Sequence, residues 1–332
     1  MVIIDSYAWA VVLAFITMLC WGSWANTQKL ATKQWPFQLF YWDYAVGVLL
    51  LSLLLAFTAG SIGTEGRSFI QDLTQADASA LGSAFLGGVV FNIANILLVA
   101  AIAIAGMAVA FPIGIGLALA LGVIVNYIAT PLGNPVLLFI GVALVVVAIV
   151  LDAMAYRKLP GQTESPTKGI VISLLAGVLM GFFYRFVAAS MVADFASPEP
   201  GRLTPYTASV IFALGLLASN FIWNTIFMYK PVTGEKVTYA DYFKKGDTRL
   251  HLIGILGGAI WSLGFTVNII AAEQAGFAIS YGLGQGATAV AALWGVFIWK
   301  EFKGAKGVNA LITAMFIFFI VGLGLIIAAR LY

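Results

Sequence analysis

The chain is poor in the side chains on which most soluble activities depend. Its 332 residues include one cysteine, Cys20, which excludes an intramolecular disulfide, and one histidine, His251. Without a cluster of Cys and His, no metal site is predicted. No nucleophile–base pair appears, so the sequence supports neither an enzyme nor a cofactor. We interpret His251, beside the end of an apolar run, as an interfacial residue and not as a ligand.

Charge is also scarce. Charged residues make up 9% of the chain and the formal net charge is +3, which is too small to predict a nucleic-acid partner. Apolar residues make up 62%, and the mean hydropathy is +1.01. This composition predicts an integral membrane protein, because a bilayer is crossed by runs of about 20 apolar residues. The first run lacks a preceding basic region and a small-residue cleavage site, so we expect it to be a retained span.

Ten apolar runs follow one another along the chain, and each is expected to be a helix because backbone groups in lipid must be satisfied within their own segment. The predicted spans are 7–31, 37–59, 80–103, 107–128, 135–156, 169–193, 205–228, 250–273, 277–299 and 307–330. The sequence therefore predicts an all-α, multi-pass membrane protein.

Basic residues in the connections predict the orientation. The even-numbered connections and the termini hold only Arg67, Arg202 and Arg330, whereas the odd-numbered connections hold most of the others. Those others are Lys29, Lys33, Arg157, Lys158, Lys168, Lys230, Lys236, Lys244, Lys245, Arg249, Lys300, Lys303 and Lys306. Because basic loops stay in the cytoplasm, we expect both termini to lie outside the cell inner or plasma membrane.

A stretch of the chain occurs twice. Residues 85–127 and 255–297 align without a gap at an offset of 170 residues. The matched glycines are Gly87 and Gly88 with Gly257 and Gly258, Gly106 with Gly276, and Gly114 and Gly116 with Gly284 and Gly286. The glycine stripes serve either close helix packing or a direct role beside a solute.

Because each copy belongs to a half of five spans, an odd number, the halves are predicted to face opposite ways across the membrane. The predicted halves are 1–156 and 169–332, joined by a cytoplasmic linker at 157–168. Such an inverted repeat places a substrate site near the midplane.

Ionisable residues inside the predicted spans point to function, because they are costly in lipid unless paired or hydrated. Asp43 and Lys29 lie at similar depths in neighbouring spans. We expect them to pair and to couple a proton to transport, with Asp43 as the proton carrier. In the competing interpretation Lys29 snorkels to the headgroups and Asp43 caps a polar face.

Arg185 lies deep in the sixth predicted span. One interpretation is a structural clamp to Asp194 or Glu273. The other is a cavity-facing guanidinium that binds oxygens of a solute through its planar set of donors. The neighbouring Tyr184 and Gly181 favour the cavity.

Uncharged polar and aromatic side chains complete the candidate site. Amides both donate and accept hydrogen bonds, and aromatic rings stack on flat solutes, which together suits a neutral polar solute. The candidate substrate-binding residues are Trp24, Asn26, Asn92, Asn95, Tyr184, Arg185, Trp261, Asn268, Tyr281 and Gln285.

Several motifs occur in a familiar order. They are WGSW at 21–24, Trp42-Asp43-Tyr44 followed by AFTAGSIG at 56–63, GMAVAFPIGIG at 106–116 and GAIWSLG at 258–264. Over nearly its whole length the chain resembles the branch of the drug/metabolite transporter superfamily that contains the glucose/ribose porters, rhamnose–proton symporters and ureide permeases. The resemblance implies ten helices in two inverted five-helix halves. It also implies import of sugars or of ureides and nucleobases, generally with a proton. Arg185 matches no pattern of these families, and the long central insertion of plant ureide permeases is absent.

The sequence thus predicts a secondary active transporter that imports a small polar metabolite by alternating access. The solute is a monosaccharide or a ureide- or nucleobase-like heterocycle, the coupling ion is a proton or else sodium, and the protein is a monomer or homodimer. The competing hypothesis is an exporter of amphipathic drugs or metabolites, which would need a wide apolar cavity with few amides. A membrane scaffold would not need Asn and Arg at span centres.

Overall fold

The computed structural model describes residues 1–31, 35–105, 107–159, 167–232 and 234–332, and these form helices joined by turns and loops. Gly106 of the repeat, Lys33 and residues 160–166 of the predicted linker lie outside the described residues. The helices are α1 (Tyr7–Ser23), α2 (Ala25–Ala31), α3 (Phe37–Phe57), α4 (Phe69–Gln75), α5 (Ala78–Ala105), α6 (Met107–Ala129), α7 (Pro135–Tyr156), α8 (Thr167–Ser190), α9 (Pro205–Tyr229), α10 (Tyr239–Lys245), α11 (Thr248–Ala275), α12 (Phe277–Gly284), α13 (Ala287–Leu293), the π-helix η1 (Trp294–Ile298) and α14 (Asn309–Ala328).

Within the described residues, nine helical segments are long and apolar enough to cross a bilayer. They match nine of the ten predicted spans. The remaining one, the fourth, is α6, in which the described part contains a shorter apolar helix, Ile113–Ala129. The prediction of a multi-pass membrane protein is confirmed.

Two of the spanning segments are interrupted. The first breaks at Trp24, between α1 and α2, and the ninth breaks at Gln285, between α12 and α13. Glycines on both sides of Gln285 favour this break, because glycine is a poor helix former. Interrupted backbone at membrane depth is tolerated only where it is buried in protein or lines a cavity. The breaks therefore point to the interior between these segments.

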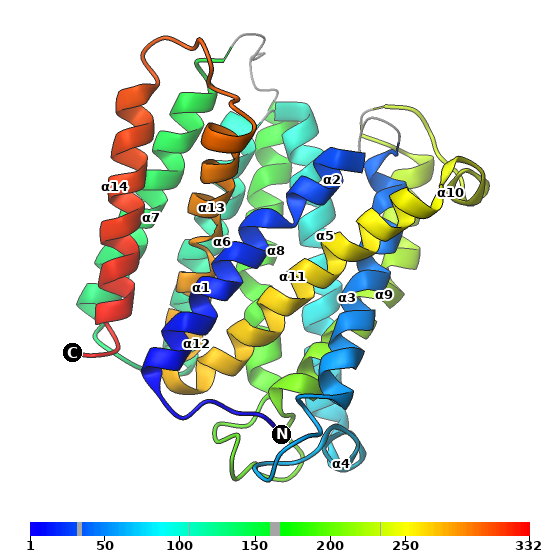
Figure 1. Ribbon diagram of the computed structural model, residues 1–332, viewed down its shortest axis with the longest axis vertical. Coiled ribbons are helices and arrows are strands. Elements are labelled where there is room, and N and C mark those ends of the chain that lie inside the picture. The colour runs from blue at the N-terminus through cyan, green and yellow to red at the C-terminus, as the bar shows by residue number, and fades with distance from the viewer. Residues whose placement is uncertain (32–34, 106, 160–166, 233) are drawn as a thin grey trace.

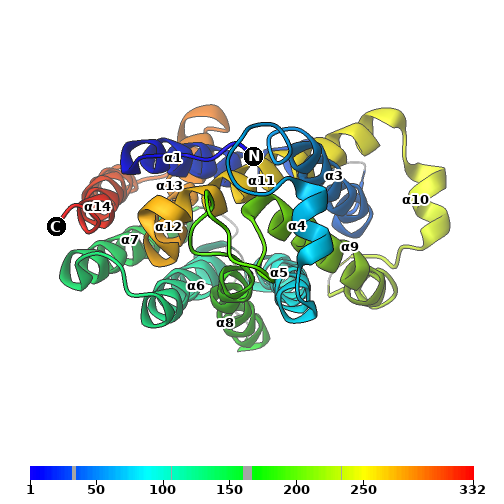
Figure 2. The same ribbon diagram turned by 90° about the horizontal axis from the view of Figure 1, so that it is seen from below.

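The connections divide between the two ends of the bundle as the basic residues predicted. In Figure 1 both chain ends and α4 lie at the lower end, whereas α10 and the connection between α13 and α14 lie at the upper end. Viewed from below, the bundle has two layers, with α14, α1, α11 and α3 in one and α7, α6, α8, α5 and α9 in the other (Figure 2).

Glycines let neighbouring helices of the same layer approach closely, at corresponding places in the two layers. A Cβ on Gly88 of α5 would lie 2.0 Å from the carbonyl oxygen of Phe212 in α9. A Cβ on Gly258 of α11 would lie 2.0 Å from the carbonyl oxygen of Tyr44 in α3. The backbones are in direct contact at both places, so no residue with a side chain fits there. These paired glycine contacts hold α5 on α9 and α11 on α3.

Candidate functional site

A cavity of about 160 Å³ lies between the two layers, beside both interrupted segments. Its wall is formed by Trp21, Gly22, Trp24, Ala25, Phe91, Asn95, Leu98, Ile115, Met180, Phe183, Trp261, Gln285, Ala287, Thr288 and Ala291. The structure thus brings together four residues that the sequence predicted for a solute site, which are Trp24, Asn95, Trp261 and Gln285. They come from the junction of α1 and α2, from α5, from α11 and from the break between α12 and α13.

Aromatic rings make up much of this wall. Trp261 stacks on Trp21 with ring centroids 5.7 Å apart and lies 4.4 Å from Phe91. The indole nitrogen of Trp21 donates a hydrogen bond of 3.2 Å to the carbonyl of Trp261, which fixes the stack. Trp24 packs on Tyr44 at 4.9 Å. A small planar ring would therefore meet preorganised aromatic surfaces.

Two amides supply the polar groups of the cavity. Asn95 donates from Nδ2 to the hydroxyl of Tyr41 at 3.1 Å, which orients its side chain. Gln285 is 8% exposed, and its side-chain amide makes no hydrogen bond within the described part of the chain. The amide of Gln285 is thus available to a ligand.

Other predicted site residues are used internally. Asn92 donates to the hydroxyl of Ser219 at 2.9 Å, and Asn268 donates to the carbonyl of Ser280 at 2.9 Å. The hydroxyl of Tyr281 lies 3.2 Å from the carbonyls of both Ala118 and Met180, so this residue ties α12 to α6 and α8.

Asn26 and Tyr184, also predicted for the site, lie away from the cavity wall as well. Asn26 donates to the carbonyl of Ser23 and accepts from the indole of Trp299. Tyr184 is fully buried and packs on Tyr281.

Within the described residues, Arg185 makes neither of the two contacts that its interpretations require, and its role stays a prediction. It is absent from the described cavity wall, and it forms no ion pair within the described residues. Glu273 accepts from the backbone nitrogen of Phe195, and Asp194 accepts from the backbone nitrogen of Ala196. The side chain is partly exposed on α8. Glu273 and Asp194 each accept from backbone through one carboxylate oxygen, and the other oxygen of Glu273 has no hydrogen-bond partner in the described residues.

The predicted ion pair between Lys29 and Asp43 is wrong. Lys29 pairs with Glu301 at 2.5 Å and lies 4.2 Å from the ring centroid of Trp299. Asp43 is 2% exposed and contacts His251 instead, with Nδ1 2.9 Å from one carboxylate oxygen. Sequence reasoning treated His251 as interfacial because it lies beside the end of an apolar run. Its contact with Asp43 joins residues 208 positions apart, so no local pattern indicated it.

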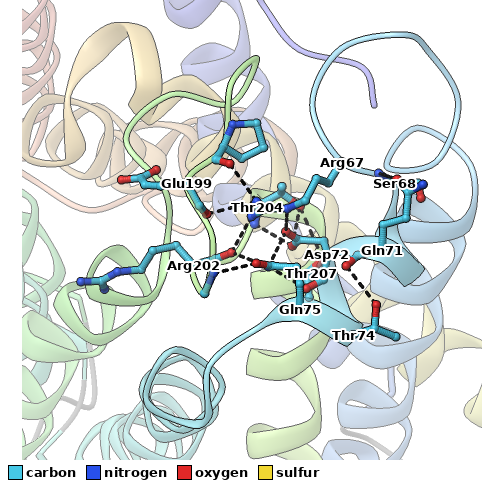
Figure 3. Close-up of polar contacts among 12 residues, drawn as sticks. Arg67, Ser68, Gln71, Asp72, Thr74, Gln75, Glu199, Arg202, Thr204 and Thr207 are labelled. Carbon is cyan, nitrogen blue, oxygen red and sulfur yellow. Dashed lines mark hydrogen bonds and ion pairs between the residues drawn. The ribbon is translucent and has the colours of Figure 1, made fainter.

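Polar contacts close the end of the bundle at which the chain begins and ends (Figure 3). Arg67 donates to the carboxylate of Asp72 at 2.9 Å and to the carbonyls of Pro198 and Arg202 at 2.8 Å. Asp72, fully buried, also accepts from the backbone nitrogen and hydroxyl of Thr204. We call this set the terminal-end clamp. It holds α4 against the segment between α8 and α9. The sequence did not predict this clamp, because its residues belong to two connections that lie far apart along the chain.

Comparisons with known proteins find similar sequences and a similar fold over nearly the whole chain. A family model described as ureide permease matches residues 40–165 and 155–329. Similar curated proteins include Ureide permease 4 and Ureide permease 2 of Arabidopsis thaliana, each 22% identical over 99% of this chain and 99% of the relative. Ureide permease 1 of the same plant is 21% identical over the same shares. A crystal structure of another protein matches with a TM-score of 0.61 over 97% of this chain and 98% of that chain at 14% identity, a likeness of fold alone.

Proposed function

The chain belongs to the ureide permease family of membrane transporters, and on that premise we propose that it imports a small polar heterocycle of the ureide or nucleobase class together with a proton. Transport would proceed by alternating access. The observation that carries this proposal is the central cavity, in which stacked aromatic rings face two amides. Flat heterocycles rich in carbonyl and N–H groups match such a lining, because amides offer both donors and acceptors.

The size of the cavity also supports this choice. Sites for drug-sized ligands usually measure about 300–1,000 Å³. The cavity here measures about 160 Å³, which suits one small ring and not an amphipathic drug. The test is uptake into proteoliposomes of labelled allantoin, as a ureide, and uracil, as a nucleobase. Uptake of glucose alone would favour a monosaccharide, and extrusion of ethidium without uptake of any of the three would favour an exporter.

Replacing Gln285 tests the role of the unpaired amide. Gln285→Leu keeps the size of the side chain but removes its donors and acceptor. If the amide binds the solute, the KM for uptake should rise about tenfold, since a lost hydrogen bond of about 1.4 kcal/mol corresponds to that factor. Gln274→Leu is the control, because that amide reaches the carbonyl of Ile4 away from the cavity. An unchanged KM in Gln285→Leu would remove Gln285 from the site.

We further propose that the two halves form the inverted five-helix repeats of a ten-span transporter. Phe91 and Trp261, which are 170 residues apart, both line the cavity and pack on each other. Ile115 and Gln285 have the same separation and also line it. The backbone contact of Gly88 on α9 has its counterpart at Gly258 on α3. Equivalent positions of the two halves thus meet around one site, as an inverted repeat requires.

The closed terminal end suggests which state of the transport cycle this is. The terminal-end clamp joins α4 to the segment before α9, whereas the cavity wall includes Trp24 and Ala25 near the opposite end of the first span. We assign this state as inward-facing, with the clamp as the closed outer gate. The assignment follows from the proposed orientation, in which the basic odd-numbered connections are cytoplasmic.

Cysteine labelling tests that orientation. In a Cys20→Ser background, Ile3→Cys and Leu331→Cys should react with a membrane-impermeant maleimide added to intact cells. Lys244→Cys, on the exposed side of α10, should react only after the cells are permeabilised. The reverse pattern, with both terminal positions protected, would invert the proposed orientation and assign the clamp to the inner gate.

A further inference from the structure

A carboxylate, an imidazole and a phenol meet away from the central cavity. His251 Nδ1 lies 2.9 and 3.1 Å from the two carboxylate oxygens of Asp43. The hydroxyl of Tyr242 donates to Asp43 at 2.5 Å. The three residues come from α11, α3 and α10, so the contact joins two spans to the short helix of the intervening connection. Trp35 covers them, with its ring centroid 4.9 Å from that of His251.

We propose that Asp43 and His251 together form the proton-binding site of the transporter, with Tyr242 as a permanent hydrogen-bond donor to it. The proposal rests on the proposed function, proton-coupled import. It adds His251, which faces Asp43 directly, and it replaces the pairing with Lys29 that the sequence suggested.

The charge of the pair supports this role. With a neutral imidazole, Asp43 and His251 carry a net charge of −1, and one added proton brings that charge to zero. A net charge inside a membrane protein is costly, so binding the proton removes an electrostatic penalty. Imidazole changes its charge in the physiological pH range, which makes it suitable for a cycle of binding and release.

The route of the proton follows from the orientation of the ring. Nδ1 faces the carboxylate, so the added proton goes to Nε2. That nitrogen lies on the side of Gly246, at the junction of α10 and α11, and the His251 side chain is 27% exposed. The proton therefore exchanges at the end of the bundle at which α10 lies (Figure 1).

Tyr242 does not compete for this proton. Burial, followed by the hydrogen bond to the Asp43 carboxylate and its charge, raises the pKa of Tyr242 well above its ordinary value. The phenol therefore stays protonated and donates to Asp43 throughout the pH range in which imidazole titrates.

The other ionisable groups around the pair already have partners or lie on the neighbouring surface. Asp241 and Lys245 of α10 pair with each other at 2.9 Å. Asp247 caps α11 through the backbone nitrogen of Leu250. The remaining groups on the adjoining elements are Tyr41 and Tyr44 of α3, Tyr239 and Lys244 of α10, Arg249 of α11, Lys29 of α2 and, at the far end of α11, Glu273. Lys29 is held by Glu301. Apart from Lys29, none of these groups makes a hydrogen bond or ion pair with His251 or the Asp43 carboxylate within the described residues, so the pair is the local acceptor of a proton.

The proton-binding pair is connected to the cavity through α3. Tyr41, two residues before Asp43, accepts a hydrogen bond from Asn95 in the cavity wall. Tyr44, directly after Asp43, packs on Trp24 of the same wall. A Cβ on Gly254 would lie 2.4 Å from Cβ of Asp43, so α3 and α11 are in tight contact there. A change in charge at Asp43 that shifts α3 would therefore also shift the contacts that Tyr41 makes with Asn95 and that Tyr44 makes with Trp24.

The single histidine allows a test that needs no substrate. Purified protein with 13C-labelled histidine gives one imidazole signal, and its chemical shift is followed between about pH 5 and 9. Asp43→Asn removes the counter-charge of the imidazolium, so the midpoint of this titration should move by about one pH unit or more. The control is Glu235→Gln, which changes an exposed carboxylate in the connection before α10 and should leave the midpoint in place. A midpoint shared by the wild type and Asp43→Asn would overturn the proposal.

A transport measurement then tests coupling separately. In proteoliposomes that take up allantoin or uracil, His251→Gln should lose accumulation driven by a pH gradient but retain exchange of labelled for unlabelled solute. Accumulation at more than about half of the wild-type level would also overturn the proposal. If the wild type takes up neither solute, the proposed function fails while the histidine titration still decides whether the pair binds a proton.

Discussion

Asp43→Asn is expected to abolish uphill uptake while leaving exchange of solute across the membrane. A gradient of one pH unit supplies about 1.4 kcal/mol per proton, enough for about tenfold accumulation of a solute carried with one proton. Asp43→Asn removes the negative charge that holds the added proton on His251, so the site binds that proton much less readily at physiological pH. The accumulation ratio should therefore fall from about ten towards one in proteoliposomes with an acidic exterior.

Asp43→Asn changes the charge of the side chain while nearly keeping its shape. Asn has nearly the size of Asp, and its oxygen can still accept the hydrogen bond from Tyr242, so the contact of α3 with α10 should survive. Melting curves close to those of the wild type and retained exchange would show that the protein is folded and binds solute. Asp241→Asn, at the exposed pair with Lys245, should accumulate solute normally. Full accumulation by Asp43→Asn would show that the proton binds elsewhere.

Gly88→Ala is expected to cause one of the largest losses of stability among single-methyl additions in the described bundle. The new Cβ would lie 2.0 Å from the carbonyl oxygen of Phe212 and 2.8 Å from the backbone nitrogen of Leu216. Both atoms belong to the backbone of α9, so no side-chain rotation relieves the clash and the two helices must separate. Overpacking of this kind costs about 1–3 kcal/mol or more, and the melting temperature should fall by about 5–10 °C.

The same substitution one and a half turns earlier in α5 provides the control. Around a Cβ on Gly82 there is no atom within 4 Å, so Gly82→Ala adds a methyl group to open space. It should leave the melting temperature unchanged or raise it slightly, because Ala favours a helix over Gly by about 1 kcal/mol. Equal melting temperatures for the two variants would mean that α5 and α9 pack less closely than the structure shows.

The corresponding change in the other half extends this prediction. A Cβ on Gly258 would lie 2.0 Å from the carbonyl oxygen of Tyr44, which is the same distance as at Gly88. If the halves are structural repeats, Gly258→Ala should lose about as much stability as Gly88→Ala. A loss at one position only would weaken the inverted-repeat proposal without affecting the membrane fold.

The sequence by itself determined the class of protein and the main course of the chain. Apolar runs of about 20 residues cross a bilayer wherever they occur, so the spans depended on local composition and not on distant contacts. The distribution of basic residues distinguished the odd-numbered connections from the even-numbered ones, and this bias is also a property of the local sequence. The burial of Asp43 and the motifs that point to the transporter family were likewise readable along the chain.

Tertiary structure alone decided which polar residues meet. One residue turns a helix by about 100°, so neighbouring amides on one span can face a cavity or a packed interface. Asn95 lines the cavity, whereas Asn92, less than one turn away, is bonded to Ser219. Asp43 contacts His251, and both predicted partners of Arg185 accept hydrogen bonds from backbone nitrogens. The partners are separated by up to 208 positions along the chain, so no local sequence pattern indicates that they meet. Their contacts depend on how each helix is rotated and packed against its neighbours.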